Sequence, residues 1–243
     1  MTVSQNSQPS PAPAFSLVIP CFNEARALPE LIERCAFVAR TGGGEVILVN
    51  NGSTDDSEEV LKKLLPASNG LVRSVTVKEN RGYGFGILSG LAEARAPIVG
   101  WTHADLQTDP VDVLRALPTL EDNDGPILIK GRRYGRNFSD RFFTAGMSVF
   151  ESLLFVKPLT DIYGQPTLFS RELIDEWGEP PEDFALDLFA LYSARRLKYR
   201  VVRFPVIFAP RKFGSSSWNF NFAAKRKFIK RTVSYSFALR KKL

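Results

Sequence analysis

The segment Phe15-Ser-Leu-Val-Ile-Pro-Cys-Phe-Asn-Glu24 indicates the fold class. Its short apolar run, ended by Pro20, is typical of a buried strand, and apolar residues at helical spacing follow from 24 to 40. The same order recurs along the chain. Further strands are predicted at 45–49, 71–77, 97–102 and 126–130, and helices at 53–65 (opened by a capping box of Ser53 and Asp56), at 83–95 and from Asp109-Pro110. This alternation predicts an α/β fold with a mostly parallel central sheet flanked by helices.

Polar or glycine-rich segments follow the first four predicted strands. They are Pro20-Cys-Phe-Asn-Glu24, Asn50-Asn-Gly-Ser-Thr-Asp-Asp56, Lys78-Glu-Asn-Arg-Gly-Tyr-Gly-Phe-Gly86 and His103-Ala-Asp-Leu-Gln107. Ligands bind beyond the carboxyl ends of parallel strands, so we expect these segments to line one site. Asp105 and Gln107 are two residues apart, which places both side chains on one side of an extended segment. They are predicted to share one Mg²⁺ or Mn²⁺ with a diphosphate.

Each of these segments also has a purely structural interpretation. Asn51-Gly52 is a common turn dipeptide, and the glycines between 82 and 90 also suit close helix packing. Asp105 is equally suited to cap the following helix. His103, the only histidine, is alone more often a hydrogen-bonded structural residue than a metal ligand.

The distribution of charge divides the chain. Residues 188–243 carry fifteen Lys or Arg and no acid, which leaves 17 basic and 26 acidic residues before them. A basic end on an acidic body suggests an anionic partner such as a phospholipid surface, and no nucleic-acid-binding motif is recognised. Two cysteines outside any CxxC pair favour a reducing compartment. We find no signal peptide and no apolar run of the roughly 18–20 residues that span a bilayer.

Taken as a set, six segments resemble the inverting family 2 glycosyltransferases. Within that family the resemblance is to the branch of dolichyl-phosphate mannose synthase and the bacterial polyprenyl-phosphate glycosyltransferases. The segments are Val18-Ile-Pro-Cys-Phe-Asn-Glu24, Val49-Asn-Asn-Gly-Ser-Thr-Asp55, Asn80-Arg-Gly-Tyr-Gly84, Ala104-Asp-Leu-Gln107, Gly131-Arg-Arg133 and Arg211-Lys-Phe-Gly-Ser-Ser216. The resemblance implies a GT-A fold, a nucleotide-sugar donor and a divalent metal, Mn²⁺ or Mg²⁺. It divides the chain into a disordered leader (1–14), a GT-A catalytic domain (15–217) and a basic amphipathic C-terminal helix (218–243).

The resemblance also implies roles for individual residues. The nucleotide-binding set is Pro20, Phe22, Glu24, Asn50, Gly52, Arg81 and Asp105, with Asn50 reading the base. The metal ligands are Asp105, Gln107 and, in place of a carboxylate, His103. The loop that closes over the diphosphate and the acceptor phosphate contains Arg211, Gly214 and Ser216, and Arg133 holds acceptor phosphate or donor sugar. Asp105 and Arg211 are the implied catalytic residues.

Three positions depart from the family pattern. Asn50 replaces an aspartate that accepts a proton from the imino group of uracil or guanine, so the donor base stays open. His103 replaces the first aspartate of the DxD pattern, and an imidazole ligand favours Mn²⁺ over Mg²⁺. Ser217 replaces a lysine, so the loop lacks one positive charge.

Two acceptors are compatible with these residues. A lipid phosphate is already a nucleophile, whereas a sugar hydroxyl needs a carboxylate base, for which Asp187 or Asp183 is the candidate. Asp161 is a further polar residue on the acceptor side. Our leading interpretation is transfer to a polyprenyl-phosphate-type lipid by a protein peripheral on the cytoplasmic, inner face of a membrane. A glycan acceptor, or a catalytically silent GT-A domain that binds nucleotide or membrane, is the alternative.

The basic C-terminal segment suits that location. Apolar residues recur there at roughly helical intervals, at Phe222, Ile229, Val233 and Phe237. Lysines and arginines surround them, as in helices that lie in a membrane interface. A helix that packs this apolar stripe on the catalytic domain is equally compatible with the pattern.

Overall fold

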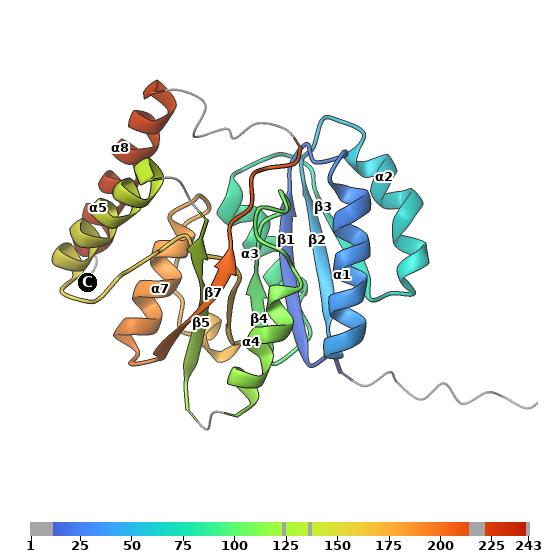
Figure 1. The fold of residues 1–243 in the computed structure, drawn as a ribbon, viewed down its shortest axis with the longest axis horizontal. Coiled ribbons are helices and arrows are strands. Elements are labelled where there is room, and N and C mark those ends of the chain that lie inside the picture. Colours follow the sequence, from blue (N-terminus) through green and yellow to red (C-terminus); the bar gives the residue numbers. More distant parts are fainter. Residues whose placement is uncertain (1–11, 123–124, 136–137, 214–221, 242–243) are drawn as a thin grey trace, which may run out of the picture.

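The central feature of the molecule is one seven-stranded sheet in the order β3-β2-β1-β4-β6-β5-β7 (Figure 1). The computed structural model describes residues 12–122, 125–135, 138–213 and 222–241. Only β6 runs antiparallel to its neighbours. The strands are β1 Phe15–Cys21, β2 Glu45–Asn51, β3 Val72–Val77, β4 Ile98–Trp101, β5 Ile127–Tyr134, β6 Thr167–Ser170 and β7 Arg200–Ile207. The predicted α/β class with a mostly parallel sheet is confirmed.

Helices connect these strands. They are α1 Leu28–Gly42, α2 Ser57–Leu64, α3 Tyr83–Glu93, α4 Asp112–Glu121, α5 Phe138–Phe155, α6 Glu172–Asp175, α7 Leu186–Arg196 and α8 Phe222–Lys241, with a 3₁₀ turn η1 at Leu65–Ser68. The predicted capping box is wrong: α2 begins at Ser57, and its N-cap Asp56 makes no side-chain cap hydrogen bond. Ser53 instead accepts a hydrogen bond from the backbone N–H of Asn23, so it belongs to the preceding loop.

Alternation along the central strands divides the core between the two faces of the sheet. On β1, Leu17 and Ile19 belong to the buried cluster that includes α1 and α4. Val18, between them, belongs to the cluster that includes α3 and α7. Both faces of β1 and β2 are therefore covered, which explains their continuous apolar sequences.

The second half of the sheet contains strands that the sequence did not reveal. The predicted strand 126–130 extends to Tyr134, and β6 is inserted between β5 and β4. A Cβ at Gly100 would lie 2.0 Å from the carbonyl oxygen of Thr167, so the close approach of β4 and β6 requires glycine there.

Helices α5 and α8 lie side by side at one end of the molecule (Figure 1). The Ser236 hydroxyl on α8 donates to Glu151 Oε1 on α5 at 2.6 Å. The described part of the basic C-terminal segment is helix α8, and of its apolar stripe Ile229 and Val233 are partly buried while Phe237 is 48% exposed. The residues that α8 buries are Thr232, Ser236 and Leu239.

Some expectations fall on residues outside the described ranges. These include most of the predicted leader, the start of the C-terminal segment, Gly214, Ser216 and Ser217. Over the described part of the chain, no helix is both long and apolar enough to cross a membrane.

Candidate active site at the carboxyl edge of the sheet

Two loops at the carboxyl ends of β1 and β2 are tied together by side chain to backbone hydrogen bonds. Each bond links one residue of 23–25 to one residue of 53–57 across the two loops. The bonds are Asn23 N to Ser53 Oγ (3.1 Å), Thr54 N to Asn23 Oδ1 (2.8 Å), Ala25 N to Asp55 Oδ2 (3.1 Å) and Glu24 N to Ser57 Oγ (3.2 Å). These bonds hold Glu24 beside the β2 loop, so two segments of the predicted nucleotide site are adjacent.

Asn50 is the last but one residue of β2 and is 2% exposed. Its Oδ1 accepts a hydrogen bond from the backbone N–H of Ser53 at 3.1 Å. Gly52 permits this turn because its φ is +71°, and a Cβ there would lie 2.5 Å from the backbone nitrogen of Asn80. The amide of Asn50 is thus oriented by its own loop.

Arg211 brings the centre of the site together. Its Nη2 lies 3.3 Å from Glu24 Oε1 and 3.2 Å from Asp105 Oδ2. Glu24 follows β1, Asp105 follows β4 and Arg211 follows β7, so three distant segments converge there. Burial raises the pKa of Glu24 to about 6, although Arg211 opposes that shift. The predicted convergence of these residues is confirmed, and a guanidinium here neutralises two carboxylates.

The segment from Asp105 to Gln107 is a turn, so the extended geometry we expected is wrong. Leu106 has a left-handed backbone with φ +56°. The backbone N–H of Gln107 donates to Asp105 Oδ1 at 3.1 Å, and Gln107 Nε2 donates to the carbonyl oxygen of Ala209 at 3.1 Å. Asp105 therefore turns its other oxygen toward Arg211. Gln107 binds the segment that follows β7 through its hydrogen bond to Ala209.

His103 lies beside Tyr83, with ring centroids 5.3 Å apart. Burial lowers the pKa of His103, so the imidazole is neutral at physiological pH, the form that ligates metals. Tyr83 stacks in turn on Phe184 at 4.7 Å. The ring of His103 thus forms part of an aromatic wall next to Asp105.

Asp187, the candidate base, is 1% exposed beneath this wall. Its Oδ1 accepts hydrogen bonds from Gln165 Nε2 at 2.6 Å and Trp101 Nε1 at 3.3 Å, and Lys130 Nζ lies 3.2 Å away. Burial lowers the pKa of Lys130 to about 8, against the opposing effect of Asp187. This buried network was not predicted, because a lysine in a strand is ordinarily a surface residue.

The other predicted residues are distributed around the site. Arg133 on β5 donates from Nε and Nη2 to Asp161 Oδ1, and its backbone N–H donates to Oδ2, so the structure supplies a partner for the carboxylate whose role was open. Arg81 is bound to both carboxylate oxygens of Glu182 and lies over the ring of Phe85, 4.0 Å from its centroid. Phe22 is 45% exposed and Pro20 half-buried at the end of β1.

Comparison with known proteins identifies the family. The family model described as glycosyl transferase family 2 matches residues 16–178, which include Glu24, Asn50 and Asp105. The chain belongs to glycosyl transferase family 2. The resemblance stated from the sequence motifs is therefore confirmed for the family, while the roles of individual residues stay predictions.

The chain is similar in sequence to other glycosyltransferases over most of its length. It is 28% identical over 216 residues to the undecaprenyl-phosphate 4-deoxy-4-formamido-L-arabinose transferase of Klebsiella pneumoniae (strain 342), covering 86% of this chain and 64% of that protein. The protein of that name from Salmonella paratyphi B is 26% identical over 217 residues, which cover 87% of this chain and 64% of that protein. The chain thus spans less than two thirds of the length of these relatives.

Solved structures of glycosyltransferases share the fold. Glucosyl-3-phosphoglycerate synthase from Mycobacterium tuberculosis, in complex with Mn²⁺, UDP and phosphoglyceric acid, superposes with a TM-score of 0.72 at 19% identity, covering 94% of this chain and 78% of that one. A mannosyltransferase from Pyrobaculum calidifontis, in complex with GDP-mannose and Mn²⁺, superposes with a TM-score of 0.65 at 20% identity. The match covers 97% of this chain and 66% of that one. The expected GT-A fold is confirmed.

Proposed function

We propose that this glycosyltransferase moves a sugar from a nucleotide-diphosphate donor to a polyprenyl-phosphate-type lipid at a membrane surface. The observation that carries the proposal is the position of Arg211 between Glu24 and Asp105. A guanidinium is suited to a diphosphate because it donates two parallel hydrogen bonds to phosphate oxygens. Arg211 is therefore placed to exchange its carboxylate partners for the donor.

The residues present fit a divalent cation held jointly with the donor. Among the described residues, no group of three His, Cys, Asp or Glu side chains forms a complete metal site. Asp105 supplies a carboxylate, His103 a neutral imidazole and Gln107 an amide whose nitrogen is already bound. Oxygen ligands from a diphosphate would complete such a set. A cation there would neutralise charge on the departing nucleoside diphosphate.

The environment of Asp187 favours a lipid phosphate over a sugar hydroxyl as acceptor. A general base must lie within hydrogen-bonding reach of the proton that it removes. Asp187 is instead buried against Lys130, Trp101 and Gln165. A phosphate oxygen needs no base, and the relatives named above are undecaprenyl-phosphate transferases.

The test is transfer of labelled sugar to undecaprenyl phosphate from a panel of nucleotide-diphosphate sugars, with Mn²⁺ or Mg²⁺. We expect metal-dependent product that is lost in Asp105→Asn and retained in Asp122→Asn, a matched change at an exposed carboxylate. Metal-dependent nucleotide binding without transfer would indicate the silent module. Product formed only on a glycan hydroxyl would refute the lipid acceptor.

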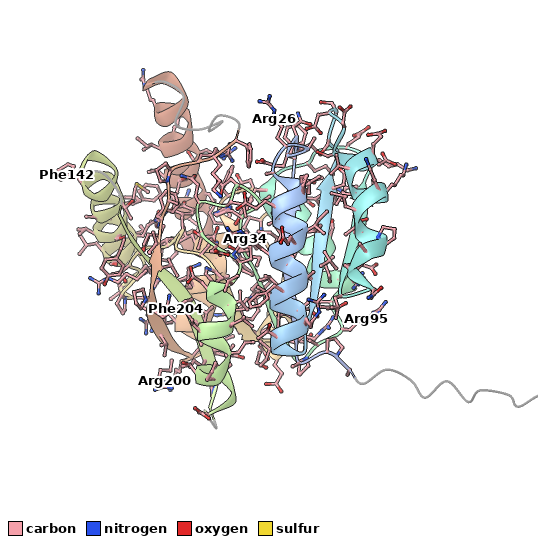
Figure 2. The ribbon with its side chains drawn as sticks, turned by 45° about the vertical axis from the view of Figure 1, so that its right-hand side comes forward. Arg26, Arg34, Arg95, Phe142, Arg200 and Phe204 are labelled. Carbon is pink, nitrogen blue, oxygen red and sulfur yellow. The ribbon has the colours of Figure 1, made fainter. Side chains whose placement is uncertain are left out.

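The proposed membrane location is supported by the outer face of α5. Phe142, Val149 and Leu153 are 75%, 59% and 75% exposed and recur at helical spacing. Figure 2 shows Phe142 projecting from the outer end of this helix. The inner face of α5 buries polar Ser148 and Glu151. A helix in contact with water has the opposite arrangement, whereas one against lipid turns its apolar face outward.

Helix α8 repeats this inverted arrangement beside α5. It buries Thr232 and Ser236 along with Leu239, and its Phe237 is half-exposed. Its sequence contains no acid, and its exposed basic residues are Arg226, Lys230, Arg231, Arg240 and Lys241. Apolar and basic side chains together match an anionic leaflet, where each Lys or Arg contributes about 1 kcal/mol. Two free, buried cysteines suit the cytoplasmic, inner face.

Flotation with vesicles tests this location. We expect binding to phosphatidylglycerol vesicles that is weaker with neutral vesicles and weaker in the double variant Phe142→Ser, Leu153→Ser. Burying one such side chain is worth about 1.5–3 kcal/mol, so the loss is at least about tenfold. Phe37→Ser on α1, which removes a 49% exposed phenylalanine elsewhere, is the control. Equal loss in the control would refute the α5 face.

A further inference from the structure

Asn50, near the carboxyl end of β2, has a buried side chain whose amide is held by its own loop. We infer that the donor carries a base whose central Watson–Crick ring nitrogen is an acceptor, as in cytosine or adenine, rather than an N–H donor, as in uracil or guanine. The inference rests on the proposed function, with the donor base placed at Asn50 as the family resemblance implies.

The orientation of the Asn50 amide follows from its hydrogen bond. The group that approaches Oδ1, at 3.1 Å, is the backbone N–H of Ser53, which only donates. A flipped amide would set two donors against each other, so the oxygen must face Ser53. Among the described residues, the side chain of Asn50 forms a hydrogen bond only through Oδ1. The group that remains to contact a ligand is the Nδ2 amide, which is a hydrogen-bond donor.

The surrounding loops hold Asn50 in this orientation. Ser53 is fixed because its hydroxyl accepts from Asn23 N, and the turn between Asn50 and Ser53 needs the left-handed Gly52. The acidic neighbour Asp55 is committed elsewhere: its Oδ2 accepts from Ala25 N and its Oδ1 from the N–H and hydroxyl of Ser57. Asp55 therefore does not replace the acceptor that an imino N–H would need.

The chemistry of the base edge then sets the preference. Uracil N3 and guanine N1 carry a hydrogen, which would face the Nδ2 donor and be left without an acceptor. Cytosine N3 and adenine N1 carry a lone pair that accepts from Nδ2. A buried polar group that loses its partner costs enough to give a preference of about tenfold or more. A carboxylate at this position keeps the bond to Ser53 with one oxygen and accepts an imino N–H with the other.

The experiment measures binding of CDP, ADP, UDP and GDP with Mn²⁺ to the full chain by calorimetry, for wild type and Asn50→Asp. We expect wild type to bind CDP or ADP about tenfold more tightly than UDP and GDP, and Asn50→Asp to reverse the order. The CDP and ADP arms separate a pyrimidine from a purine site. Asn80→Asp is the matched control: Asn80 Oδ1 also accepts a backbone N–H, from Gly82 at 2.9 Å, and the change adds the same charge in the adjoining loop. It should shift all four affinities alike.

The outcomes separate the inference from the proposed function. Tighter binding of UDP or GDP by wild type overturns the inference while the proposed function stands. An unchanged base order in Asn50→Asp also overturns it, because Asn50 would then not read the base. No binding of any diphosphate by a folded protein overturns the proposed function itself.

Discussion

Glu151 makes the packing of α5 against α8 dependent on pH. It is fully buried, and among the described residues its Oε2 has no hydrogen-bond partner, while Oε1 accepts from Ser236. Burial raises the pKa of Glu151 from 4.5 to about 7, against the lowering effect of Ser236. The native state thus keeps a proton that the unfolded state has lost, so the contribution of Glu151 to stability is fully present below pH 4.5 and is lost as the pH rises to about 7. One pKa unit is worth 1.36 kcal/mol, so the decline from this group is at most about 3 kcal/mol.

Glu151→Gln removes this titration and keeps an acceptor for Ser236. We expect the variant to gain up to about 3 kcal/mol of stability relative to wild type between pH 4.5 and 8, and little below pH 4.5. Urea denaturation across that range measures the difference, and hydrogen exchange in α5 and α8 detects local opening of the pair. Glu59→Gln, at an exposed position of α2, controls for the loss of a charge. A difference between wild type and Glu151→Gln that does not change with pH would refute the reasoning.

Two further changes test the loops and the buried pair. Gly52→Ala should lower the free energy of unfolding, measured by urea denaturation, by at least about 2 kcal/mol more than Gly70→Ala does. Both glycines have positive φ, but a Cβ at Gly52 would lie 2.5 Å from backbone, whereas a Cβ at Gly70 would have no atom within 4 Å. Equal costs would contradict this. Lys130→Met should lower the free energy of unfolding by about 3–5 kcal/mol, because it leaves the Asp187 carboxylate buried without its cation. The double variant with Asp187→Leu should recover most of that stability. A double variant as unstable as the single one would show that packing, not charge, sets the cost.

The first half of the fold was predictable because its strands are apolar or alternating and are regularly separated by helices. The capping box was misassigned because Ser53 satisfies a neighbouring loop, a contact that local sequence does not reveal. Strand β6 was missed because Thr167–Ser170 has only two apolar residues, between a threonine and a serine, and its place beside β4 depends on Gly100. Which side of α8 packs inward was left open by the sequence, because its apolar stripe suits either a membrane interface or the catalytic domain, and only the contact with α5 shows that Thr232, Ser236 and Leu239 are buried.

The site shows the same division between local and distant determinants. The residue types at the strand ends predicted that Glu24 and Asp105 would meet, because parallel strands deliver their carboxyl ends to one edge. The geometry of Asp105 and Gln107 was not predictable from their spacing, because a left-handed Leu106 turns the chain between them. Asp105 Oδ1 accepts from the Gln107 N–H and Oδ2 faces Arg211, so the guanidinium charge opposes a cation at Oδ2 while Arg211 stays there. A diphosphate is the group that would draw Arg211 away, so the arrangement favours a cation that enters together with the donor over one that is held tightly beforehand.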